Sequence, residues 1–145
     1  MLSTNHLRAL GVALLFTTAC HQETPAPAAI SQAMLEGKWL EGAGFYKSVD
    51  SKGKVTAQGD VATANPAIYT TLSSTTWARS GQLSRSYPYV RQDSLLTRSS
   101  YFDNGQNHYD EQFYILQLTD HYMLLRQTRS YPDGSKSFDY QQYSR

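Results

Sequence analysis

From residue 38 to its end, the chain alternates between short apolar or aromatic runs and polar segments that favour turns. The runs are rich in Tyr, Thr, Val, Ile, Leu and Phe, and Gly, Asp, Asn or Pro separates them, which is typical of short β-strands. In the first half of this region, strands are predicted at residues 39–46, around Val55, and at residues 68–72, 75–79 and 83–90. Residues 57–66 carry weaker signals and are expected to form a loop. Pro88 cannot donate to a strand ladder, so it predicts an edge strand or a bulge.

The second half of the region has stronger turn chemistry. The segment Asp103-Asn104-Gly105 is a hairpin signal, and further turns are expected at residues 119–121 and 132–134. These turns separate predicted strands at residues 94–102, 109–118, 122–131 and 138–143. About eight or nine short strands with no helix between them predict an antiparallel sandwich or a meandering barrel.

The segment before the strands divides into two parts. Residues 30–36 predict two helical turns with Ile30, Met34 and Leu35 on one side, and Gly37 is well placed to end them. Residues 21–29 are polar, rich in Pro and Ala, and lack hydrophobic periodicity. This composition predicts a tether.

The first nineteen residues have the organisation of an export signal. His6 and Arg8 stand without an acid, an apolar run covers residues 10–16, and small residues precede the only cysteine. The run is well short of the roughly 20 residues that a membrane-spanning helix needs. Residues 1–19 are therefore predicted to be a signal peptide that is removed.

The cysteine lies where this signal ends. Thr17-Thr18-Ala19-Cys20 resembles the lipobox of bacterial lipoproteins, although that family usually has Leu, Val or Ile where this chain has Thr17. The alternative is an ordinary secreted protein with a cysteine near its cleavage site. A lone thiol has no internal disulfide to form, whereas lipidation gives it a role. The resemblance implies that acyl chains on Cys20 hold the protein on a membrane, and His21 after it favours the outer membrane of the cell envelope.

The charge balance argues against a nucleic-acid partner. Of 13 Lys and Arg, cleavage before Cys20 removes only Arg8, and 12 Asp and Glu remain to balance the rest. A nucleic-acid footprint would need clustered Lys and Arg to neutralise the phosphates of the backbone, and the sequence shows no such cluster. With 145 residues and 40% hydrophobic residues, the chain has room for one domain with one core.

Several short motifs carry a family resemblance. Gly37-Lys38-Trp39 is similar to the Gly-x-Trp on the first strand of lipocalins, and residues 87–97 and 114–124 resemble strands of lipocalin-like lipoproteins of Bacteroidetes-type bacteria. The resemblance implies a single antiparallel meandering β-barrel of about eight strands over residues 35–145, preceded by a short helix within residues 20–34. It also implies that Gly37 and Trp39 lie at the closed base of the barrel. A late-strand arginine, Arg126 or Arg129, would pack over Trp39, and Arg126 is the residue assigned to this structural role.

Few residues have the spacing of a chemical site. His108, Asp110 and Glu111, and the pair Asp120 and His121, have metal-ligand side chains, but both groups lie beside predicted turns and are expected to be solvated. The chain has no nucleophile elbow, Gly-rich phosphate loop or cysteine pair, so neither a metal nor another cofactor is predicted and the protein is not expected to be an enzyme.

Tyrosines and arginines leave two alternatives open. The eleven tyrosines either line an aromatic ligand cup or simply suit half-buried strands. By alternation, Tyr114, Leu116 and Leu118 share one face of their strand. Arginines recur in the middle strands, where they present guanidinium groups to an anionic ligand or lie on a solvated outer face: Arg79, Arg85, Arg91 and Arg98.

Two functions follow from the predicted barrel. The first is a monomeric, membrane-anchored, lipocalin-like binding protein for a small apolar or amphipathic ligand. The second is a filled barrel that contacts a protein or glycan of the envelope, since eight-stranded barrels can be hollow or filled. A hydrolase or isomerase that uses His108 or His121 is the third hypothesis.

Overall fold

The computed structural model of the chain describes residues 30–81, 85–102 and 107–145. The predicted signal peptide, Cys20, the tether at residues 21–29 and the hairpin turn at residues 103–105 lie outside the described residues. In the described part, one short helix, α1 (Gln32–Leu35), precedes nine strands. The strands are β1 (Gly37–Val49), β2 (Val55–Val61), β3 (Tyr69–Leu72), β4 (Thr76–Arg79), β5 (Arg85–Gln92), β6 (Leu95–Phe102), β7 (Asn107–Leu118), β8 (Tyr122–Ser130) and β9 (Lys136–Ser144).

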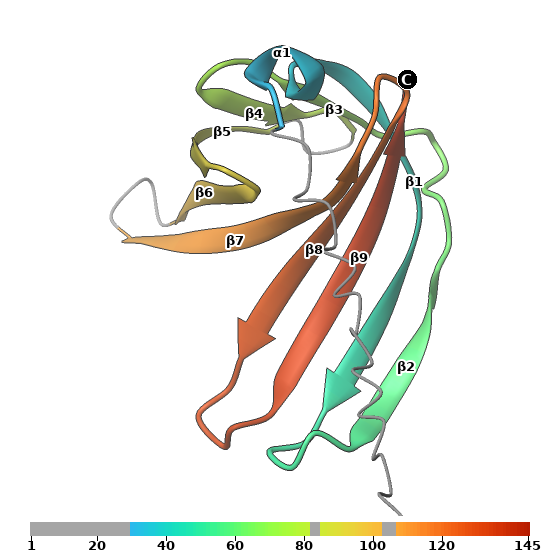
Figure 1. The fold of residues 1–145 in the computed structure, drawn as a ribbon, viewed down its shortest axis with the longest axis vertical. Helices are drawn as coiled ribbons and strands as arrows, with labels where there is room; N and C mark the ends of the chain where they lie inside the picture. Colours follow the sequence, from blue (N-terminus) through green and yellow to red (C-terminus); the bar gives the residue numbers. More distant parts are fainter. Residues whose placement is uncertain (1–29, 82–84, 103–106) are drawn as a thin grey trace, which may run out of the picture.

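Eight of the strands close into an antiparallel β-barrel. Strands β3 to β9 pair in sequence order, and β1 pairs with both β3 and β9 to complete the ring. This is the fold class that the sequence predicts, and antiparallel neighbours need only short connections. The helix α1 lies over one end of the barrel, beside the C-terminus (Figure 1).

Strand β1 changes partner along its length. Gly37–Leu40 pairs with β3, while Gly44 to Val49 pairs with β2, the additional strand. A bulge between Glu41 and Gly44 bends β1 against β9 at the point of change. Figure 1 shows the result: β8, β9, β1 and β2 continue side by side beyond the short strands β3 to β6 and form a wall along one side of the open end.

Two sequence predictions about individual strands are wrong. Residues 57–61 form most of β2 and are not a loop. Their side chains have weak β propensity, but pairing with β1 satisfies their backbone hydrogen bonds and holds them in a strand. Pro88 lies on neither an edge strand nor a bulge. It faces Thr76 on β4, and pairing of β5 with β6 begins one residue later, at Tyr89, so the missing N–H falls where that ladder ends.

The helix and the turns form where local chemistry predicts them, but the helix is four residues long and not the two turns expected over residues 30–36. Asp50 accepts the backbone N–H groups of Lys52 and Lys54, and Gly53 has a φ of 82° in the turn before β2. Ser31 caps α1 by accepting the Met34 N–H at 3.2 Å. The helix ends at Leu35, one residue before its cap Glu36. No helix in the described part of the chain is long and apolar enough to cross a membrane.

Candidate functional site

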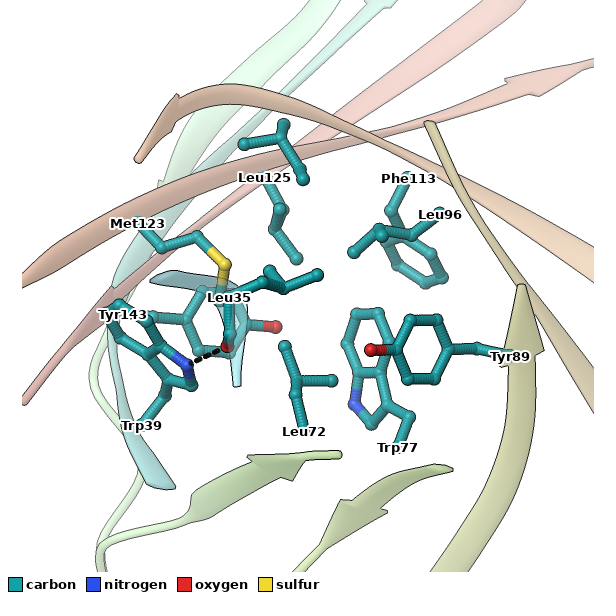
Figure 2. Packing of buried hydrophobic residues seen from close by; sticks show 11 residues of the cluster. Leu35, Trp39, Leu72, Trp77, Tyr89, Leu96, Phe113, Met123, Leu125 and Tyr143 are labelled. Carbon is teal, nitrogen blue, oxygen red and sulfur yellow. Dashed lines mark hydrogen bonds between the residues drawn. The ribbon is translucent and has the colours of Figure 1, made fainter. Parts of the chain in front are cut away.

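The end of the barrel beneath α1 is filled with apolar side chains. Leu35 from the helix points into a cluster formed by Trp39, Leu72, Leu96 and Met123, and each of these is at most 2% exposed (Figure 2). Burying a side chain of this size stabilises the fold by about 1.5–3 kcal/mol. Leu35 therefore acts as a plug that fills this end of the barrel.

Trp39 satisfies its one polar atom through this plug. Its indole N–H donates to the Leu35 carbonyl at 2.9 Å (Figure 2). The arginine that packs on the Trp39 ring is Arg145, whose Cζ lies 4.1 Å from the ring centroid. The assignment of Arg126 or Arg129 to this role is wrong.

Both rejected arginines lie elsewhere. Arg126 faces outward on β8, and its Cζ is 5.1 Å from the Tyr114 ring centroid. Arg129 pairs with Asp139 at 2.9 Å near the open end. Strand position alone misleads here, because the residue that reaches Trp39 follows the last strand and turns back over the base.

Arg145 ties the helix to the barrel. Its guanidinium donates to the carbonyl of Glu36 at 2.6 Å and to that of Met34 at 3.0 Å, and its Nε donates to the Asp120 carbonyl at 2.6 Å. Gly37 makes room for this group. Its φ is 130°, and a Cβ at this position would lie 2.7 Å from Arg145 Nη1.

Above the plug, the inward side chains change from apolar to polar along five strands. On β8, Met123 and Leu125 are buried, and Gln127 and Arg129 occupy the next inward positions. The same change runs from Leu96 to Arg98 on β6, from Phe113 to Glu111 on β7, from Trp77 to Arg79 on β4 and from Tyr143 to Gln141 on β9. The filled base thus supports a polar cup at the open end.

The cup encloses a cavity of about 410 Å³. Its lining includes aromatic rings, amide side chains and ion pairs: Trp77, Tyr87, Phe113, Tyr140, Tyr143, Gln127, Gln141, Arg79, Arg98, Arg129, Glu41, Glu111 and Asp139. Ligand cavities in proteins commonly have volumes of about 300–1,000 Å³. The cavity therefore has room for a small organic molecule.

The Arg98–Glu111 ion pair is the central charged feature of the cup. Arg98 Nε and Nη2 both donate to Glu111 Oε2, at 3.0 and 2.5 Å, and the two side chains are only 15% and 12% exposed. Ser100 Oγ donates to the same oxygen at 2.8 Å, and Gln127 Nε2 donates to Glu111 Oε1 at 2.9 Å. Burial alone would raise the pKa of Glu111, but the hydrogen bond and charge of Arg98, with Ser100 and Gln127, hold it below its usual value.

Aromatic rings enclose the other partner of this pair. Arg98 Cζ lies 4.8 Å from the ring centroids of Trp77 and Phe113 and 4.9 Å from that of Tyr87. Guanidinium groups are weakly hydrated and stack on aromatic faces, so this enclosure suits Arg98 better than a lysine. The rings and Glu111 together leave Arg98 little freedom.

A second pair lies beside the first. Arg79 Nε and Nη2 donate to the two carboxylate oxygens of Glu41, both at 2.8 Å, and Thr70 Oγ1 donates to Glu41 Oε1 at 2.7 Å. The hydrogen bond to Glu41 raises the pKa of Arg79 against the opposing effect of burial. Glu41 is 7% exposed and Thr70 is fully buried, so the carboxylate is held rigidly.

Two further polar groups complete the interior. The Tyr143 side chain faces Glu41 and both arginines, and its burial, followed by the charge of Glu41, raises its pKa well above the usual range. Trp77 Nε1 is buried and has no hydrogen-bond partner within the described structure. Such an unpaired donor is uncommon in folded proteins.

The remaining candidates from the sequence are distributed differently. An outer face is the wrong expectation for Arg79 and Arg98, which line the cup; the Arg98 side chain is 15% exposed, whereas that of Arg79 is 46% exposed. Arg85 is exposed, and Arg91 donates to the Asp93 carbonyl at 2.8 Å and to the carbonyl of Ile30, which ties the start of the described chain to β5.

The two metal-ligand groupings do not come together. Glu111 points inward, whereas Asp110 bonds to Ser99 at 2.7 Å on the other face of β7, and the His108 side chain lies outside the described part. Asp120 and His121 contribute backbone carbonyls to Arg145. No group of three or more His, Cys, Asp or Glu in the described residues could hold a metal ion.

Few of the tyrosines line the cavity, so most do not form the aromatic ligand cup considered from the sequence. Tyr87, Tyr140 and Tyr143 line the cavity, whereas others, such as Tyr109 and Tyr131, are exposed. Alternation also fails on β7. A bulge between Ile115 and Gln117 turns Leu118 toward the core, away from the face of Tyr114 and Leu116.

One sequence signal identifies the cup in retrospect. On β4, β6 and β7, a charged residue lies two positions from a large apolar residue, which places both on the same face of the strand. A face that is half apolar and half charged is expected of a barrel whose base is filled and whose mouth is open.

No protein-family model, curated protein or solved structure matches the chain at a significant level.

Proposed function

We propose that the protein is a non-enzymatic binding module that holds a small amphipathic molecule in the cup. The observation that carries the proposal is the cavity of about 410 Å³, which combines aromatic walls with two fixed Arg–Glu pairs above a filled base. The Arg98–Glu111 pair is largely buried, and a buried ion pair is costly to desolvate and adds little stability. Its position beside an accessible cavity is easier to explain by recognition than by folding.

The lining favours an amphipathic ligand over a purely apolar one. Trp77 and Phe113 offer apolar surface toward the base, and polar groups surround the space above them. A wholly apolar molecule would cover charged groups without replacing their hydration, which is unfavourable. A molecule with one apolar part and one polar part fits both regions.

The N-terminal segment supports a cellular location for this binding protein. The lipobox-like residues before Cys20 and the Gly37–Trp39 resemblance support a lipocalin-like lipoprotein of the outer membrane. Ile30 packs against the core at the filled base, so a tether at residues 21–29 would reach the barrel from that end.

Native mass spectrometry tests the proposal directly. The mature chain with Cys20→Ser, purified from a bacterial envelope fraction, is expected to carry an extra mass that denaturation releases. A clean unliganded mass, together with no thermal shift against a panel of amphipathic compounds, would reject the proposal and favour the filled barrel that contacts an envelope partner.

Two matched variants test whether the ligand binds in the cup. Gln141 lines the cavity, whereas its neighbour Gln142 is exposed on the opposite face of β9. Gln141→Trp should fill the cup and abolish the extra mass, and Gln142→Trp should leave it unchanged. Equal retention by both variants would place the ligand elsewhere.

A further inference from the structure

From the hydrogen-bond pattern of the cup, we infer that the polar part of the ligand is an anion, bound by Arg98 and Arg79. This inference rests on the proposed binding function and specifies its ligand class. Carboxylates and phosphates share the required chemistry, because both accept hydrogen bonds and carry negative charge. Side chains of the cup already form hydrogen bonds with one another. The donors and acceptors that are left without a partner determine which chemical group of a ligand can bind.

The two carboxylates are occupied. An ionised carboxylate offers about four lone-pair sites, and Glu111 receives four hydrogen bonds, two from Arg98 and one each from Ser100 and Gln127. Glu41 receives three, from Arg79 and Thr70. A cationic or donor ligand would find little free acceptor capacity at these groups.

Hydrogen-bond donors remain available. A guanidinium has five N–H groups; Arg98 and Arg79 each use only Nε and Nη2 toward their glutamates, so Nη1 has no partner on either glutamate. Among the cavity-lining residues, two buried side-chain atoms have no hydrogen-bond partner in the described structure: the donor Trp77 Nε1 and the acceptor Asp139 Oδ2, which lies 2.9 Å from Arg129 Nη1 in an ion pair. The free N–H groups of Arg98 and Arg79 are thus the donors left to a ligand, and the group that matches them accepts hydrogen bonds.

Charge and environment make an anion the best acceptor. The glutamates fix the orientation of both arginines, and aromatic rings shield Arg98 from water. Guanidinium groups whose orientation is fixed form strong charge-assisted bonds with carboxylates and phosphates. Arg98 is also largely buried, with a side chain 15% exposed, whereas the Arg79 side chain is 46% exposed. The third carboxylate of the lining, Asp139, forms an ion pair with Arg129 at 2.9 Å, which offsets its repulsion of an anion.

Titration calorimetry on the mature Cys20→Ser chain tests the inference with probes that share one alkyl chain. Octanoate and octyl phosphate should each bind at least about tenfold more tightly than octanol, the difference expected for one charge-assisted hydrogen bond. Octylammonium should bind more weakly than octanol. The stronger of the two anions identifies carboxylate or phosphate as the natural group. Octanol or octylammonium binding as tightly as both anions would overturn the inference while leaving the binding function intact.

Paired variants separate direct contact from general charge. Arg79→Gln should reduce the preference for the anion over octanol about tenfold or more. Arg126→Gln removes the same charge from the outer face of β8, where Arg126 packs on Tyr114 and does not line the cavity, so this variant should retain the preference. Equal losses in both variants would overturn the inference. Arg79→Lys, which retains charge without the planar fork, should lie between wild type and Arg79→Gln.

The charge of the released cargo separates the two proposals. An anionic cargo supports both, and a neutral or cationic cargo overturns the inference alone. The absence of any cargo, together with no binding of any probe, overturns the binding function and the inference with it.

Discussion

Arg145 covers the ring of Trp39 from the opposite end of the described chain, with its Cζ 4.1 Å from the ring centroid. Trp39 is the third residue of β1, and Arg145 follows β9. The contact therefore joins the two strands that close the barrel, and the carbonyls of Met34 and Glu36 bind the same guanidinium. Loss of this junction should weaken both the closure of the barrel and the seating of the helix.

Arg145→Ala should destabilise the fold by about 1–2 kcal/mol, because one cation–π contact and hydrogen bonds to three carbonyls are lost. Chemical denaturation followed by far-UV circular dichroism measures the change. Arg126→Ala serves as the control, since Arg126 packs on Tyr114 on the outer face. Arg126→Ala should leave the environment of Trp39 unchanged. A shift of Trp39 emission in Arg126→Ala, but not in Arg145→Ala, would contradict the assignment.

Gly37→Ala should cost about 2–3 kcal/mol, because a side chain at a φ of 130° is strained and also meets Arg145 Nη1. Gly53→Ala is the matched control. Gly53 has a φ of 82°, but no atom lies within 4 Å of the point where a Cβ would be placed, so only the backbone cost of about 1 kcal/mol applies. A double-mutant cycle of Gly37→Ala with Arg145→Ala should be non-additive. Strict additivity would show that Gly37 does not act through Arg145.

Glu111→Ala should destabilise the protein by about 2 kcal/mol, because it leaves Arg98 among aromatic rings without its partner. The double variant Arg98→Met with Glu111→Leu should be more stable than the sum of the single losses predicts, since neither charge then remains unpaired. Urea unfolding of wild type, the two single variants and the double variant gives the coupling energy. No coupling would mean that the pair is not formed in solution.

Acid should weaken the ion pair between Arg98 and Glu111. The folded-state pKa of Glu111 lies below its ordinary value of 4.5, so its contribution is complete above that pH and is lost as pH falls through the folded-state pKa. The stability difference between wild type and Glu111→Gln should therefore shrink between about pH 6 and pH 3. A difference that stays constant over this range would show that Glu111 has an unshifted pKa.

The two tryptophans should report separately on the base and the cup. Trp77 lines the cavity, whereas Trp39 lies in the filled base. Octanoate should alter the emission of Trp39→Phe, in which Trp77 remains, and leave that of Trp77→Phe unchanged. Calorimetry on both variants confirms that each still binds. A response from Trp39 alone would place the ligand at the base and contradict the proposed site.

The sequence by itself determined the β class, the approximate number of strands and most of the turns. These features depend on local chemistry. Alternation sets which residues can face a core, and residues such as Gly53 and Gly134 adopt the positive φ that turns require. The short helix before Gly37 also follows from local signals, because Ser31 caps it and Leu35 provides its buried face.

Only the tertiary structure decided which distant residues meet. Residues 57–61 form a strand because the far half of β1 lacks β3 as a partner there, and neither segment reveals this pairing alone. Arg145 covers Trp39 because closure of β1 against β9 brings the ends together, and spacing along the late strands favours the wrong arginine. Arg79 and Arg98 point inward because the register across the barrel aligns them with Glu41 and Glu111. Charge alone predicts exposed arginines, whereas long-range pairing places these two around a cavity.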